Sequence, residues 1–89
     1  MSEREEKRIN IAEDLMKHFD IKWCNKYPKK RFYVFDKESN KYVENKILLE
    51  REILDRWLNS RIEDRSAIFS YIAMRVKVDD IKDLNKEEE

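Results

Sequence analysis

The stretch RFYVFDKESNKYVE, Arg31 to Glu44, decides the fold that the sequence predicts. Its first part is rich in aromatic and branched residues, which suit a half-buried β-strand. The polar residues 37–40 favour a turn, and residues 41–44 can return as a second strand. We therefore predict a two-stranded antiparallel β-hairpin over residues 31–44. An isolated hairpin is marginally stable in water, so this one has to pack on helices.

Helical patterns lie on both sides of the hairpin. Ser2 and Glu5 fit a capping box, and the apolar residues that follow recur at helical spacing. This pattern predicts a first helix over about residues 3–18. Asn45 is a suitable N-cap for a second helix over about residues 46–59, whose apolar residues have the same spacing.

A third helix is expected after a tight break in the chain. Ser60 and Glu63 fit a second capping box, and apolar residues on one face follow over about residues 61–76. Residues 77–89 are predicted to be a C-terminal tail. The prediction is a single small domain over residues 1–89 with an α+β fold, in which a two-stranded hairpin lies between the first and second of three helices.

The composition excludes several classes of protein. The chain has 89 residues, of which 45% are charged and 40% hydrophobic, so we expect one folded domain with a densely charged surface. It contains no glycine, whereas phosphate-binding Walker loops, dinucleotide fingerprints and nucleophile elbows all depend on glycine. We therefore expect no unaided nucleotide hydrolysis, and because the residues of the chain do not assemble an acid, a base and a nucleophile, we expect a protein that is not an enzyme. The richness in Lys, Glu and Arg is typical of heat-adapted proteins.

Cysteine content and hydropathy predict a cytoplasmic protein. Cys24 is the single cysteine and cannot form an internal disulfide, so nothing indicates an oxidising compartment. The first ten residues lack the apolar region of a signal peptide. No window approaches the roughly 20 apolar residues that a membrane span needs, so we expect no membrane partner.

The segment over residues 20–31 is predicted to be a basic loop, because no helical stripe continues there and Pro28 disfavours a helix. Residues 22–31 carry five basic side chains and no acidic one, with aromatic residues between them. Basic groups bind phosphates, and exposed aromatic rings stack on unpaired bases. The alternative is a solvated loop whose Trp23 folds onto the hairpin. The predicted nucleic-acid-binding residues are Lys22, Trp23, Lys26, Tyr27, Lys29, Lys30 and Arg31.

Other candidate sites are weaker. His18 and Cys24 lack the further clustered Cys or His of a zinc site, so we expect no metal, no cofactor and no catalytic pair. Tyr71 and Met74 share a helix face that could form a small docking patch if it is exposed. The acids among the arginines of the last two helices, Asp64 included, are typical of a solvated surface with weak ion pairs.

The order of the segments resembles the domain that lies just before the superfamily III helicase in phage, plasmid and poxvirus primase-helicases. The resemblance spans most of the chain. The matching segments are Ile11 to Trp23, Phe32 to Asp36, Lys41 to Val43, Ile47 to Leu58, Arg65 to Ile72 and Val78 to Asn85. In two respects the chain departs from the family pattern. Residues 26–31 are basic where the family usually has a Thr and an acid. The sequence ends at Glu89, where the family's domain is normally followed by a helicase, so we expect either an excised domain of a larger replication protein or a free-standing relative.

The resemblance implies a non-enzymatic nucleic-acid-binding or coupling module of a DNA replication protein from a virus or plasmid. The expected partners are single- or double-stranded DNA and a helicase or another replication protein. The alternative is a small protein-interaction factor of a virus or plasmid, or a homo-oligomer, that docks through an exposed helical face such as that of Tyr71 and Met74.

Overall fold

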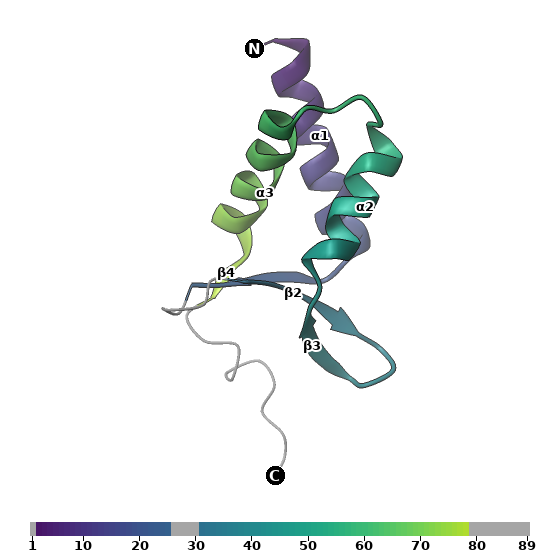
Figure 1. Cartoon of the computed structure of the whole chain (residues 1–89). Coiled ribbons are helices and arrows are strands. Elements are labelled where there is room, and N and C mark those ends of the chain that lie inside the picture. The colour runs from purple at the N-terminus through teal and green to yellow at the C-terminus, as the bar shows by residue number, and fades with distance from the viewer. Residues whose placement is uncertain (1, 26–30, 79–89) are drawn as a thin grey trace.

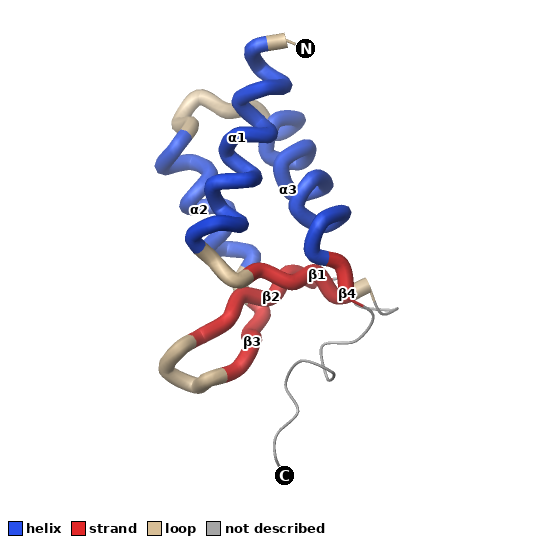
Figure 2. Tube along the Cα trace, turned by 180° about the vertical axis from the view of Figure 1, so that it is seen from behind, coloured by secondary structure: helices blue, strands red, loops and turns tan. Residues whose placement is uncertain are grey.

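Three helices stand on one face of a four-stranded sheet in the computed structural model, which describes residues 2–25 and 31–78 (Figure 1). The helices are α1 (Glu3–His18), α2 (Lys46–Arg56) and α3 (Ile62–Val76). The strands are β1 (Ile21–Cys24), β2 (Arg31–Asp36), β3 (Lys41–Glu44) and β4 (Lys77–Val78). The view from behind shows the same layer of helices above the same layer of strands (Figure 2).

The sheet corrects the predicted architecture. The prediction of a two-stranded hairpin between the first two helices is wrong, because β2 and β3 belong to a larger mixed sheet with the strand order β3-β2-β1-β4. Strand β1 pairs antiparallel with β2 and parallel with β4. The fold is α+β, but its sheet includes strands from the predicted loop, residues 20–31, and from the predicted tail, residues 77–89.

The two additional strands are short, which explains why local sequence patterns do not indicate them. Strand β1 is four residues long, too short for a clear alternation, although Ile21 and Cys24 at its ends are buried. Strand β4 has two residues and forms only because α3 returns the chain to the edge of β1. The Asn25 amide extends this pairing by donating a hydrogen bond to the Val78 carbonyl at 3.0 Å.

The first two helices begin at side-chain caps, which satisfy N–H groups that have no partner within the helix. At α1 the Ser2 hydroxyl accepts a hydrogen bond from the Glu5 amide at 3.0 Å, and the predicted capping box is present. At α2 the Asn45 side chain accepts from the Leu48 amide at 3.2 Å. Within the part of the chain that the structure describes, no helix is both long and apolar enough to cross a membrane.

Helix α3 begins in a different way from the one predicted. The expected capping box of Ser60 and Glu63 is not the cap, because the helix begins at Ile62. Instead, the carboxylate of Asp64 accepts a hydrogen bond from the backbone amide of Arg61 at 2.9 Å. This places an acid in the first turn, where the helix dipole favours negative charge.

Asp64 is buried in the described core, which corrects its predicted place on the surface. Arg4 donates to its carboxylate from Nε and Nη2 at 3.0 and 2.6 Å, and Arg8 donates from Nε at 2.8 Å. Burial opposes ionisation, but the hydrogen bonds from Arg4, the Arg61 amide and Arg8 outweigh it and hold the pKa of Asp64 well below its usual value. The charged carboxylate therefore ties the start of α1 to the start of α3.

The hydrophobic core fills the space between the helices and one face of the sheet. Phe32 of β2 packs against Phe69 of α3 with ring centroids 5.1 Å apart, which joins the two layers. Burial of these apolar side chains is the main favourable term in folding. The buried cluster consists of Ile11, Ala12, Leu15, Ile21, Phe32, Val34, Leu49, Ile53, Trp57, Ile68, Phe69 and Ile72.

Candidate nucleic-acid interface

The two faces of the sheet differ, because the described helices cover only one of them (Figure 1). Side chains alternate between the faces along each strand. Phe32 and Val34 are buried under the helices, and their cross-strand partners Trp23 and Ile21 therefore share the helical side. The other side is called the outer face. Its residues on the three longer strands are Lys22, Cys24, Arg31, Tyr33, Phe35, Tyr42 and Glu44.

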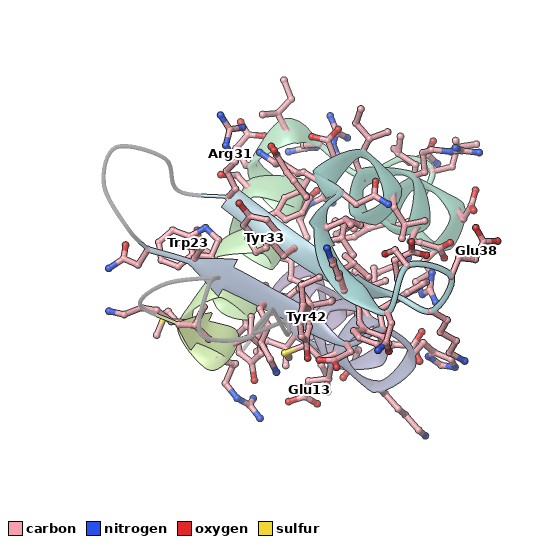
Figure 3. All side chains as sticks on the ribbon, turned by 90° about the horizontal axis from the view of Figure 1, so that it is seen from below. Glu13, Trp23, Arg31, Tyr33, Glu38 and Tyr42 are labelled. Atoms are coloured by element: carbon pink, nitrogen blue, oxygen red, sulfur yellow. The ribbon has the colours of Figure 1, made fainter. Side chains whose placement is uncertain are left out.

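Three aromatic side chains lie together on the outer face. Phe35 and Tyr42 are cross-strand partners, and their ring centroids are 5.3 Å apart at an interplanar angle of 69°. Tyr33 precedes Phe35 by two residues on β2 and lies on the same side. All three are partly exposed, and Figure 3 shows Tyr33 and Tyr42 on the strands as seen from below. Such rings on a sheet provide a surface on which unpaired bases can stack.

Tyr42 is held in place by an acid that precedes β1. Its hydroxyl donates a hydrogen bond to Asp20 Oδ2 at 2.6 Å. Burial, together with this hydrogen bond to a carboxylate, raises the pKa of Tyr42 to about 12. The side chain is therefore neutral at physiological pH, and the hydrogen bond fixes the direction of its ring.

Two cations flank the rings, and each has an acidic partner. Lys22 Nζ lies 3.3 Å from Asp20 Oδ1 and 6.0 Å from the centroid of the Tyr42 ring. Arg31 Nη1 lies 2.6 Å from Glu44 Oε2. Both ion pairs are partly exposed to solvent, where such pairs contribute at most about 1 kcal/mol. A phosphate group can therefore compete with the acid for either cation.

Part of the predicted basic surface lies outside the described residues, namely Lys26, Tyr27, Lys29 and Lys30. In the sequence they connect Asn25 to Arg31, so they follow β1 and precede β2. Cys24, at the end of β1, is buried although it belongs to the outer face. The accessible part of the described outer face is therefore formed by β2 and β3, together with Lys22.

Trp23 does not lie with Lys22, because its side chain is on the helical side of the sheet. Its ring centroid is 6.3 Å from that of Phe32. These two rings and Phe69 line a groove of about 410 Å³ between α2 and α3, called the α2–α3 groove. The structure thus places Lys22 and Arg31 on the outer face and Trp23 on the opposite side.

The predicted docking patch of Tyr71 and Met74 is exposed only in part. The Tyr71 hydroxyl donates to Glu13 Oε2 at 3.0 Å and accepts from Arg75 Nη1 at 3.0 Å. These bonds hold a half-buried tyrosine between α1 and α3. Met74 is 82% exposed, so it is the accessible apolar side chain of this pair.

His18 and Cys24, weighed above as a metal or catalytic pair, belong to different elements. His18 Nδ1 lies 2.9 Å from the Asp14 carbonyl oxygen, at the end of α1. Cys24 lies in β1 between its neighbours β2 and β4. Among residues 2–25 and 31–78, no group of three or more His, Cys, Asp or Glu side chains is placed to hold a metal ion.

The aromatic group of the outer face is the feature that the sequence-based site omits. Tyr33, Phe35 and Tyr42 are absent from the predicted set, which is confined to residues 22–31. The signal that indicates Tyr33 and Phe35 is the alternation within RFYVFD, because burying Phe32 and Val34 on one side of the strand turns the residue that follows each of them to the other side. Their grouping with Tyr42 depends on the register of β2 and β3.

Comparisons with protein-family models, with curated proteins and with solved structures found no match. The resemblance to the domain that precedes superfamily III helicases therefore stays a prediction.

Proposed function

We propose that this chain is a non-enzymatic module that binds single-stranded DNA on the outer face of its sheet. Tyr33, Phe35 and Tyr42 provide rings for bases, and Lys22 and Arg31 provide cations for phosphates. One observation carries the proposal: the three partly exposed rings gather on the sheet face that no described helix covers. Rings that served only the hydrophobic core would point to the helical side.

Single-stranded nucleic acid suits this surface better than a duplex. Stacking on a protein ring needs a base whose own face is free, and bases within a duplex are already stacked on each other. Binding to duplex DNA instead depends on many cations that contact the two phosphate backbones. On the described outer face the positive charges of Lys22 and Arg31 are paired with the negative charges of Asp20 and Glu44. Ring contacts therefore contribute more of the binding free energy than charge does.

The replication setting is the part of the proposal that depends on the order of sequence motifs. A domain beside a helicase meets single strands as the motor produces them, and a surface that accepts any base by stacking suits that position. On this proposal the protein is a coupling module of a replication protein from a virus or plasmid and acts in the cytoplasm. Residues 26–30 add three further lysines next to the outer face in the sequence.

The experiment is a binding titration with a fluorescently labelled oligothymidine, followed by anisotropy at about 50 mM and 200 mM salt. The chain should bind, and Tyr33→Ala should weaken binding about 5- to 100-fold, because stacking contributes about 1–3 kcal/mol per base. Tyr33→Phe should retain most of the affinity, since the ring makes the contact. Tyr71→Ala is the matched control and should bind normally, because Tyr71 lies between helices.

Charge variants separate phosphate contacts from ring contacts. Lys22→Ala should weaken binding of all sequences alike. It should also reduce, by about one, the magnitude of the slope in a plot of the logarithm of the association constant against the logarithm of the salt concentration. No binding of the oligothymidine at low salt would overturn the proposal, and so would equal affinity for Tyr33→Ala and the native chain. Stronger binding of single-stranded RNA than of DNA would keep the outer face as the site but remove the replication setting.

A further inference from the structure

Helix α2 carries an apolar stripe that faces away from the core. Ile47 and Leu54 on the helix and Leu58 in the turn that follows are 68%, 37% and 80% exposed. Ile47 and Leu54 are seven residues apart, which places them on one side of the helix, and Leu58 follows in the turn beyond the helix end at Arg56. Ile62, which is 75% exposed, is a further exposed apolar side chain and lines the α2–α3 groove. Large apolar side chains gathered on one side of a small domain mark an interaction surface.

Two opposite charges flank this stripe one helical turn apart. Arg51 and Asp55 are both exposed. Within residues 2–25 and 31–78, neither side chain forms an ion pair or a hydrogen bond with another residue. By contrast, Arg56 on the same helix binds both Asp14 and Glu52, at 2.8 and 2.6 Å. Arg51 and Asp55 are thus available to a partner that presents an acid opposite the first and a base opposite the second.

We propose that this partner is a second copy of the chain, with the two α2 helices packed antiparallel across a two-fold axis. Such an interface needs a patch that is complementary to itself. If Arg51 lies opposite Asp55 of the second copy, symmetry places Asp55 opposite Arg51 of the second copy. The same register puts Leu54 beside Leu54 of the second copy. It also brings Ile47 near the turn that follows α2 of the second copy, where Leu58 lies, because the start of one antiparallel helix lies beside the end of the other.

The charges of the stripe favour this occupant over others. Arg51 and Asp55 cancel each other, so the patch gives a polyanion such as nucleic acid no net attraction. A parallel pairing of α2 would set Arg51 level with Arg51 of the second copy, with no opposite charge at that level. Only the antiparallel arrangement pairs both charges while it covers the apolar side chains. The inference does not depend on the proposed function, because the stripe and the outer face are separate surfaces.

Sedimentation equilibrium at several concentrations tests the dimer, and two charge reversals test its register. Arg51→Asp alone and Asp55→Arg alone should each raise the dimer dissociation constant about tenfold or more, because each places like charges opposite each other twice. An equimolar mixture of the two variants should regain the native dissociation constant, because the mixed dimer has two opposite-charge pairs. Both positions are exposed, so both variants should fold, and circular dichroism checks that they do.

Three results would overturn the inference. They are a native chain that stays monomeric at every concentration, a dimer that Arg51→Asp leaves unchanged, and a mixture of the two variants that fails to recover dimerisation. Leu54→Glu supplies an independent test and should also give a monomer. The affinity of the monomeric variants for the labelled oligothymidine should equal the native value per chain, so a failure of the dimer is distinguished from a failure of the outer-face site.

Discussion

Asp64 shows how a single side chain can have a role that its sequence neighbourhood conceals. Its position among alternating charges on the third helix predicts a solvated surface acid, yet the structure buries it. The reason is tertiary: Arg4 and Arg8, on a helix far away in the sequence, bring two guanidinium groups to the same carboxylate. Burying a charge is costly unless it is paired and hydrogen-bonded, and Asp64 meets both conditions.

Asp64→Asn should lower the melting temperature at pH 7 by roughly 10 °C, because it removes the charge that two arginines share. Glu63→Gln is the matched control, since Glu63 is exposed on the same turn and its loss should change the melting temperature little. Thermal unfolding followed by circular dichroism measures both. Equal melting temperatures for Asp64→Asn and the native chain would contradict the role of the carboxylate in joining α1 to α3.

The pH dependence of the melting temperatures of the native chain and of Asp64→Asn gives a second expected outcome. The pKa of Asp64 is lowered in the folded chain, so its contribution is complete above the unfolded pKa of about 4 and is lost as the pH falls below that value. The difference in melting temperature between native chain and Asp64→Asn should therefore narrow between pH 6 and pH 3. A difference that stays constant over this range would indicate that shape, and not charge, stabilises the contact.

At the scale of elements, the sequence predicts the strands that local patterns define and misses the strands that depend on pairing with distant segments. The strands β2 and β3 are indicated by aromatic residues, alternation and a polar turn within one short stretch. The strands β1 and β4 depend on pairing with segments distant in the chain, and local patterns carry little of that information. For the candidate site, Lys22 and Arg31 could be predicted from charge. The separation of Trp23 from them could not, because it follows from the pairing of β1 with β2.

The turn between β2 and β3 has one position under conformational constraint. Asn40 has a φ of 60°, in the left-handed region, and its amide donates to the Asp36 carbonyl at 2.8 Å. Asparagine tolerates this region better than most residues. Asn40→Ala should therefore reduce the free energy of unfolding by about 1 kcal/mol, while Asn40→Gly should change it by less than about half of that. Urea denaturation compares the two, and a larger loss for glycine than for alanine would contradict the assignment.

At the scale of the whole molecule, the two proposed surfaces lie on different parts of the chain. Helix α2 starts next to the sheet and runs away from it, and the outer face is on the far side of the sheet from all three described helices (Figure 1). An antiparallel α2 pair would therefore carry its two sheets at opposite ends of the dimer. Neither outer face would be covered by the described helices of the dimer, and the two faces would point away from each other. Such a dimer cannot place both faces side by side on one short strand.

This arrangement predicts that the dimer bridges two separate oligonucleotides. Beads that carry one oligothymidine should retain a second, labelled one when native chain is added, because each dimer offers two opposite outer faces. Arg51→Asp should bind the beads with the same affinity per chain but should not retain the labelled strand, and mixing it with Asp55→Arg should restore capture. Equal capture by Arg51→Asp and the native chain would mean that bridging does not require the α2 pair, and the arrangement of the two sheets would then be wrong.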